Sequence, residues 1–577
     1  MTSSALVGIA LWMADVPQAR AACTVTGTGT ASAPQTGDTV ECTGTGLTTP
    51  IVPAAGASDV TIIVGDGSTP TELETDTGTA IELTDGSTAT VNAGATITTT
   101  GGATTSAISG EGDILRSTLN GGSIRAQGRF VNGIELRATG TATIDINAGS
   151  IAATGDVLST GAWASTEGDQ GTASITMGGT AAIEVSDGIG IVARSVGEDG
   201  TASLQISGGS ISGNGSSAGG NAFAGGTGGV AKVDQSGGTI MMTGKNSSGL
   251  GATADGQNSS ATVTMSDGSV SANGNQSTGA SAAVYETGSE AAVNITGGTL
   301  SVTGNSVKGT YAHADAEQST ASIIVNGTAE VSANGARSVG VFAKTTGVDT
   351  EASVTLYGGS VVVEGADSTG LHADARIANS AARITVGGGS VSTSGDNAIG
   401  AHSYAEASSG QASVMIGGGS ISTEGAASHG VFANMYGYEG TATVDISGGT
   451  ISTSGAAADA VRAGVEGPGA IARVTVSGGN VHAAGDDSNA IAVITKKTPS
   501  CDCGSEPEGS SGTVVIDGGT VSATGEGSHA VYFLASDGSK NALTIGTGAS
   551  VSGDLLSENQ GSGTTDLTFN GTGAQSF

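Results

Sequence analysis

The chain has 577 residues and a formal net charge of −34 at pH 7, although only 12% of its residues are charged. A chain this acidic has little with which to neutralise phosphates, so we expect no nucleic-acid partner. Aromatic residues contribute only 3%, whereas glycine occupies 101 positions. The acidity has two interpretations: solvation of a long surface, or binding of divalent cations. Because no dense Asp/Asn loop of calcium-site spacing is present, we favour solvation and expect no metal ion and no cofactor.

The first residues are typical of an export signal. Residues 5–14 form an apolar run that is too short to span a membrane, and Ala19-Arg20-Ala21 places small residues at a cleavage spacing. No basic residue precedes the apolar run, so either the true start lies upstream or the signal is weak. We assign residues 1–22 to a signal-like segment and expect an exported chain without a transmembrane segment.

The four cysteines form two close pairs, which favours an oxidising destination. A bridge between Cys23 and Cys42 would close a small loop at the start of the mature chain. It would lie in residues 23–120, which we interpret as an N-terminal cap followed by irregular first turns.

The second pair, Cys501 and Cys503, lies in an insertion at residues 496–508. A Cys-x-Cys segment can bind a soft metal, but no second Cys or His pair stands near it. A local disulfide is therefore the favoured interpretation, and the metal site is the alternative.

A short phrase, Gly-Gly-Ser/Thr followed by Ile or Val, recurs through residues 121–577. Its second glycine is Gly389, Gly419 and Gly449 in three successive copies, each 30 residues from the next. A period in this range indicates a solenoid, in which each unit covers its neighbours. Between the glycines, apolar and polar residues alternate with the strand period of two. The sequence predicts an all-β parallel β-helix of about 15 turns with three short strands in each.

Residues spaced by one repeat form columns of similar side chains. The predicted inward columns are Val341, Leu371, Ala401, Val431, Val461 and Ile491; Ala343, Ala373, Ser403, Ala433, Ala463 and Val493; and Val354, Ile384, Val414, Val444 and Val474. Stacking of like side chains suits a narrow, dry interior.

Another column, between the first two, collects many of the scarce rings. By the Gly-x-X-Ala pattern it contains Trp163, Val192, Phe223, Gly251, Ser281, Tyr311, Phe342, His372, His402, Phe432, Arg462, Ala492 and Tyr532. If the aliphatic columns point inward, pleating sends this column outward as an exposed contact face. The alternative places the rings inside, where Arg462 would be costly to bury. If the two stacked histidines are exposed, we expect both to charge near pH 6.

No catalytic residue can be assigned. The six histidines form no metal-binding pair, and a polysaccharide hydrolase would need opposed carboxylates beside aromatic platforms. We therefore expect no enzymatic activity. The alternative, a carbohydrate-active β-helix enzyme, finds its nearest approach in Arg462 with Asp445 and Asp459. A third hypothesis is a self-associating surface scaffold.

Taken together, the signal-like start, the cysteine-flanked opening at 22–45 and the Gly-Gly-Ser/Thr-Ile/Val units resemble the passenger region of bacterial autotransporter proteins. The resemblance implies a right-handed, pertactin-like β-helix exported to the cell surface or outer membrane by a β-barrel translocator. No barrel-like series of strands occurs before Phe577, so we expect that the barrel lies in a missing part, that it is a separate chain, or that export occurs differently. The resemblance further implies an adhesin or surface antigen. Its expected partners are a host-cell or matrix surface, or like chains.

Overall fold

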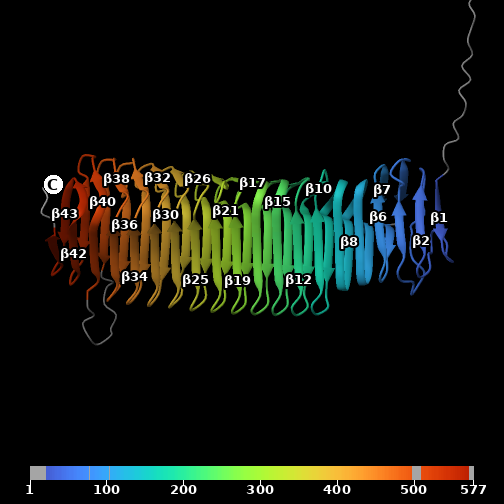
Figure 1. Cartoon of the computed structure of the whole chain (residues 1–577), viewed down its shortest axis with the longest axis horizontal. Helices are drawn as coiled ribbons and strands as arrows, with labels where there is room; N and C mark the ends of the chain where they lie inside the picture. Colours follow the sequence, from blue (N-terminus) through green and yellow to red (C-terminus); the bar gives the residue numbers. More distant parts are fainter. Residues whose placement is uncertain (1–20, 77, 103, 497–508, 571–577) are drawn as a thin grey trace, which may run out of the picture.

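The computed structural model describes residues 21–76, 78–102, 104–496 and 509–570. They form one parallel β-solenoid of about 16 turns, which Figure 1 shows as a straight rod. The predicted all-β parallel β-helix is therefore confirmed. Within the described ranges, no helix is long and apolar enough to cross a membrane.

Three strands make up each turn. Strand β24 (Val339–Thr345) pairs with β27 (Thr369–Ala375), which pairs with β30 (Ile399–Glu406), always in parallel. Pairing therefore runs along the rod between strands three places apart in the chain. The result is three long parallel sheets, which we call the A, B and C sheets in chain order within a turn.

The first turns contain β1 (Ala22–Thr26), β2 (Thr39–Thr43), β3 (Thr61–Val64), β4 (Thr71–Thr75), β5 (Thr79–Leu83), β6 (Thr88–Asn92) and β7 (Ala95–Thr100). The long strand β8 (Thr104–Thr166) continues around the corners through all three sheets, because it pairs with β5, β6 and β7 in succession.

After β8, the A sheet contains, besides β24, β27 and β30, the strands β11 (Gly188–Ser195), β14 (Ala218–Ala224), β16 (Ser248–Ala254), β18 (Thr278–Val284), β21 (Lys308–Ala314), β33 (His429–Tyr436), β36 (Val461–Glu466), β39 (Asn489–Lys496), β41 (His529–Ala535) and β43 (Asp554–Asn559). The B sheet contains β9 (Thr172–Met177), β12 (Thr201–Ile206), β19 (Glu290–Ile295), β22 (Thr320–Val325), β25 (Glu351–Leu356), β28 (Ala381–Val386), β31 (Gln411–Ile416), β34 (Thr441–Ile446), β37 (Ile471–Val476) and β44 (Thr564–Phe569). The C sheet contains β10 (Ala182–Ser186), β13 (Ser210–Asn214), β20 (Thr299–Thr303), β23 (Glu330–Asn334), β26 (Ser360–Glu364), β29 (Ser390–Ser394), β32 (Ser420–Glu424), β35 (Thr450–Thr453) and β38 (Asn480–Ala483). Four strands bend from the B sheet into the C sheet: β15 (Val230–Thr243), β17 (Ser260–Asn273), β40 (Ser511–Ala523) and β42 (Lys540–Ser552).

The three predicted inward columns line the interior of the rod. Val341, Leu371 and Val431 are fully buried, and so is their neighbouring column at Ala343 and Ala373. Aliphatic side chains one turn apart pack on each other because in-register pairing stacks equivalent residues about 4.8 Å apart. The predicted aliphatic columns are therefore confirmed.

The recurring glycines stand at the corner before most strands of the C sheet. Gly419 has φ +75°, and a Cβ atom there would lie 2.7 Å from the carbonyl oxygen of Gly389 one turn earlier. Gly389 itself has the same φ and an equivalent contact with Gly359. A side chain would be both strained and sterically blocked, which explains why the phrase returns at these corners.

Serine hydroxyls stabilise another corner from the inside. The backbone N–H of Ser338 donates to Ser368 Oγ at 3.2 Å, and Ser368 Oγ donates to the carbonyl of Gly335 at 3.1 Å. The same arrangement returns where the N–H of Ser488 donates to Ser528 Oγ at 3.0 Å. These hydroxyls satisfy buried backbone groups at a bend where the sheet ladder does not reach them.

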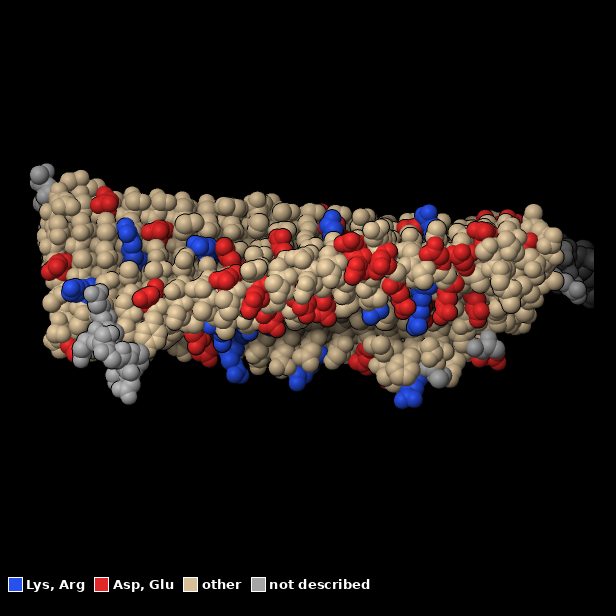
Figure 2. Space-filling view, turned by 90° about the horizontal axis from the view of Figure 1, so that it is seen from below, with Lys and Arg blue, Asp and Glu red and all other residues tan. Residues whose placement is uncertain are grey.

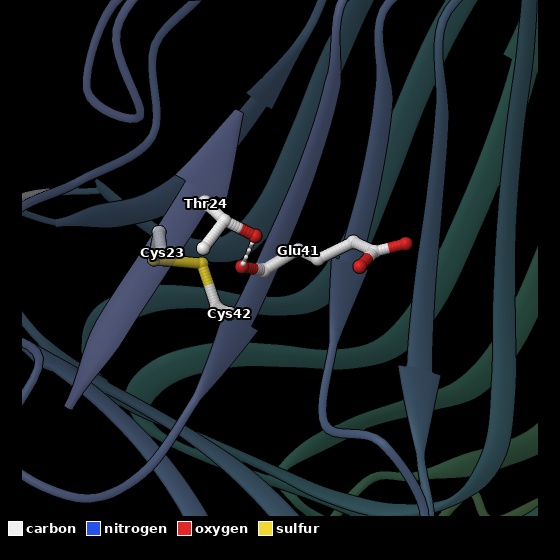
Figure 3. The surroundings of a disulfide bond; sticks show 4 residues. All are labelled: Cys23, Thr24, Glu41 and Cys42. Carbon is white, nitrogen blue, oxygen red and sulfur yellow. Dashed lines mark hydrogen bonds between the residues drawn. A yellow bond between two sulfur atoms is a disulfide. The ribbon is translucent and has the colours of Figure 1, made fainter. Parts of the chain in front are cut away.

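The N-terminal end is closed by an antiparallel strand. Strand β1 pairs with β2 so that Cys23 lies directly opposite Cys42, and the two residues form a disulfide (Figure 3). Thr24 Oγ1 also donates to the carbonyl of Glu41 at 3.5 Å. Because antiparallel β1 cannot continue the parallel ladder, it ends the solenoid at this side.

The turns that lead from the A sheet to the B sheet carry much of the acidity. Figure 2, viewed from the side of these turns, shows acidic side chains gathered along the rod. Exposed members of this row are Glu167, Asp169, Glu198, Asp199, Asp255, Glu286, Asp315, Glu317, Asp349 and Glu439. We call this row the acidic turn row.

Candidate functional site

The candidate site is the outer face of the A sheet. In β24, Val341 and Ala343 are fully buried, whereas Phe342 between them lies on the outer side and is half-buried. In-register pairing places Tyr311 and His372 beside Phe342 on the two adjacent strands. The strand spacing equals a ring-stacking distance, so rings at one position of successive turns stack on each other.

Five rings form a continuous stack, which we call the ring ladder: Tyr311, Phe342, His372, His402 and Phe432. Successive ring centroids lie 5.3, 4.7, 4.8 and 5.1 Å apart, and the last three pairs are within 15° of parallel. Each ring therefore covers the faces of its neighbours and presents only its edge to solvent.

A cation covers each end of the ring ladder. Lys308 Nζ lies 4.4 Å from the ring centroid of Tyr311, and Arg462 Cζ lies 5.2 Å from that of Phe432. Both contacts are cation–π interactions, which are attractive because the ring face is electron-rich. Burial lowers the pKa of Lys308 and raises the pKa of Tyr311 to about 12.

The two histidines of the ladder are held neutral. Burial lowers the pKa of His372 to about 3, with a smaller contribution from Arg376, and burial also lowers the pKa of His402 well below its usual value. Their Nε2 atoms are buried and have no hydrogen-bond partner. The expectation that both would charge near pH 6 is therefore wrong: stacking between hydrophobic rings desolvates the imidazoles.

One member was assigned to the wrong column. Phe223 pairs with Arg194 and Thr253, and Asn221 takes its expected place beside Val192. In β14 both Asn221 and Phe223 precede an alanine, so the X-Ala part of the pattern fits two registers that differ by two residues. The glycine of the pattern, Gly219, fits only the register of Asn221. Phe223 remains on the outer face, with Arg194 Cζ 5.6 Å from its ring centroid.

The remaining members of the predicted contact face stand apart from the ring ladder. Trp163 pairs with Val192 at the N-terminal side, and its Nε1 is buried without a partner. Tyr532 pairs with Ala492 at the C-terminal side, and its hydroxyl donates to Glu558 Oε2 at 3.0 Å. Burial, followed by that hydrogen bond, raises the pKa of Tyr532 to about 12.

An ion pair flanks the ladder on the next outward column. Asp374 is fully buried, although it lies on the outer side, because Arg376 covers it and donates from Nε to both carboxylate oxygens at 3.0 Å. Arg376 Cζ also lies 5.6 Å from the ring centroid of Tyr404, whose hydroxyl donates to Glu406 at 3.1 Å. This cluster extends the ring surface toward the acidic turn row.

A second polar cluster surrounds the C-terminal end of the ladder. The backbone N–H of Asp459 donates to His429 Nδ1 at 3.2 Å, and Arg462 Nη1 lies 3.6 Å from the Asp459 carboxylate. Burial is the main cause of the lowered pKa of His429. Asp445 lies on the B sheet, in β34, and does not join them. The three-residue approach considered for a carbohydrate-active enzyme is therefore not assembled.

Three tyrosines that the sequence did not single out provide the exposed ring surface of this side. Tyr285, Tyr436 and Tyr438 are 44%, 39% and 42% exposed, and they stand at the A-sheet ends and in the following turns. Tyr285 packs edge-on against His313, at a centroid distance of 6.0 Å. Unlike the ladder rings, they leave a substantial part of their surface to solvent. Their irregular positions in the repeat left no column to detect.

Cys501 and Cys503, the other predicted pair, lie outside the described residues. Comparisons with known proteins add no relative: no family model, curated protein or solved structure matches the chain.

Proposed function

We propose that the protein is an exported, non-enzymatic surface rod that attaches to cells, extracellular matrix or like chains through the outer face of its A sheet. The observation that carries this proposal is the concentration of rings on one side of a straight solenoid. The ring ladder, the cluster at Tyr404 and the exposed tyrosines all lie on the A sheet or in its turns. Aromatic side chains dominate the energetics of protein contact surfaces.

The geometry indicates how such a face would bind. The faces of the ladder rings are occupied by one another, so the ladder holds its own shape and contributes edges. The exposed contact area comes from Tyr285, Tyr436 and Tyr438, with Tyr404 and Arg376 beside them. Because these tyrosines lie at strand ends or in short turns that are anchored in sheets on both sides, the backbone that carries them loses little conformational entropy on binding. The acidic turn row beside them favours a partner with basic groups, because like charge would repel an acidic one.

The test is attachment by a triple variant, Y285S/Y436S/Y438S, of the whole chain. We expect at least about tenfold weaker attachment of chain-coated beads to cells or matrix, or weaker self-association, with unchanged thermal unfolding. The matched control is Y357S/M415S, which removes two residues that are 57% and 50% exposed on the B-sheet side. Equal attachment by the triple variant and the parent would exclude the A-sheet face.

A further inference from the structure

The A-sheet face changes character toward the N-terminal end. The rings are replaced there by hydroxyl groups, carboxylates and one guanidinium, which surround a hollow of about 660 Å³. Its lining includes Glu82, Glu111, Glu135, Arg137, Ser106 and Ser109, from β5 and the first part of β8. This size is within the range of small-molecule sites in proteins.

The hollow is organised around one buried carboxylate. Glu135 is 8% exposed and accepts hydrogen bonds from Ser106 Oγ at 2.8 Å, Asn132 Nδ2 at 2.7 Å and Arg137 Nε at 2.7 Å. Three donors fix this side chain in place, and the same contact orients the Arg137 guanidinium. Arg137 Nη2 also lies 2.5 Å from Glu135 Oε1. Since the Arg137 side chain remains 60% exposed, the N–H groups that do not contact Glu135 are available to a ligand.

An indole stands on the next turn of the same column. The register follows from the backbone hydrogen bonds. In the turn where Trp163 pairs with Val192, the N–H of Val196 donates to the carbonyl of Thr166. One turn earlier, the N–H of Glu167 donates to the carbonyl of Ala138 in the same way. The same register places Trp163 beside Glu135. Among the described residues no ring or cation stacks on the Trp163 indole, and its Nε1 is buried and unpartnered.

From these observations we propose that the hollow is a binding site for a neutral saccharide. Its carboxylates and guanidinium leave an excess of negative charge, which disfavours anions. Glu135 is already saturated by donors, and no group of described side chains is arranged to hold a metal ion. The hollow offers exposed acceptors at Glu82 and Glu111, donors at Arg137, and serine hydroxyl groups that can both donate and accept. This combination suits a ligand that itself donates and accepts hydrogen bonds at every edge. The half-buried Trp163 indole is outside the lining of the hollow but one turn away in the column of Glu135, where it offers an apolar surface to the C–H face of a sugar ring. This site does not depend on export or on adhesion by the tyrosines.

Trp163 makes the test direct. The chain has two tryptophans, at positions 12 and 163, so the full-length W12F variant has a single fluorophore one turn from Glu135. The fluorescence of W12F is titrated with neutral saccharides of gluco, galacto, manno and N-acetylated configuration. Galacturonate and spermidine serve as anionic and cationic probes. We expect a saturable change in Trp163 emission with at least one neutral saccharide and none with galacturonate. Because the excess negative charge attracts polycations, any response to spermidine should disappear at high salt, whereas the saccharide response should persist.

Two further variants test whether the hollow causes the change. E82Q/E111Q replaces two exposed rim carboxylates and should weaken the saccharide response about tenfold or more without altering the fold. E184Q is the matched control, because Glu184 is also exposed and lines a separate hollow with Arg125. No response to any neutral saccharide, a response to a charged probe alone, or equal affinity in E82Q/E111Q would overturn the proposal.

Discussion

Acidification should loosen the rod at the ring ladder. His372 and His402 are neutral in the folded chain because burial lowers their pKa values, to about 3 for His372. In the unfolded chain a histidine has the ordinary pKa of 6.5. Below pH 6.5 the unfolded state therefore binds a proton that the folded state excludes. Stability from these residues is complete above pH 6.5 and is lost as the pH falls toward the folded-state pKa.

The magnitude follows from the same linkage. At pH 5.5, one pH unit below the unfolded-state pKa, His372 alone lowers the free energy of unfolding by about 1.4 kcal/mol relative to neutral pH. His402 adds to this loss in the same direction. Because a solenoid opens locally, the affected unit is the set of turns around β24, β27, β30 and β33.

The critical variant is H372F/H402F, which keeps a ring at both positions and removes the titration. It also removes two buried Nε2 atoms without partners, so it should be more stable than the parent even at pH 7.5. Hydrogen exchange of the A-sheet amides, corrected for intrinsic rates, is measured at pH 7.5 and 5.5. H482F is the control, because His482 lies on the C sheet and contacts Ser522.

We expect the parent and H482F to lose protection around the ladder on acidification, whereas H372F/H402F loses at least about 1.4 kcal/mol less. All other ionisable side chains are shared by the parent and H372F/H402F, so their contribution cancels in the comparison. An equal loss in the parent and H372F/H402F would show that the imidazoles are not desolvated, and would refute the reasoning.

Two further predictions address the core and the cap. V431D should place an unpaired charge at a fully buried position and cost several kcal/mol, whereas S422D, on the outer side of the C sheet, should be nearly silent in denaturant unfolding. Equal effects at the two positions would contradict the observed strand register. C23S/C42S should destabilise the first turns by about 3 kcal/mol and expose them to limited proteolysis, while leaving the ring ladder protected. Simultaneous loss of protection along the whole rod would show that the cap controls all turns together.

Much of the fold was accessible from the sequence because one interval is repeated in register. Val341 and Leu371 are 30 residues apart in the sequence and are register partners on adjacent strands. Counting 30 residues along the chain therefore identified spatial neighbours. The same rule failed at Phe223, where alternating small residues permit a shift by two. It could not reveal Glu135 and its donors, because turns near β8 vary in length and their partners follow no fixed step.

The protonation state of the histidines was inaccessible for a different reason. The sequence placed His372 and His402 on the outside of the wall, and an outward side chain is ordinarily solvated. Burial at this face arises from stacking along the rod: Phe342 covers one side of the pair and Phe432 the other, at 4.7 and 5.1 Å. An outward direction therefore does not establish exposure in a solenoid, where the nearest neighbour of each side chain is its own equivalent one turn away.

This distinction separates two parts of the same face. Rings that stack on one another stabilise the turns but have no free face for a ligand. Recognition requires side chains whose surfaces remain available. The tyrosines at the acidic turn row have such surfaces, and the polar side chains of the hollow near the half-buried Trp163 provide the second group. Gly251 and Ser281 interrupt the ring column between the two groups. Loss of saccharide binding and loss of attachment should accordingly result from different variants of one rod.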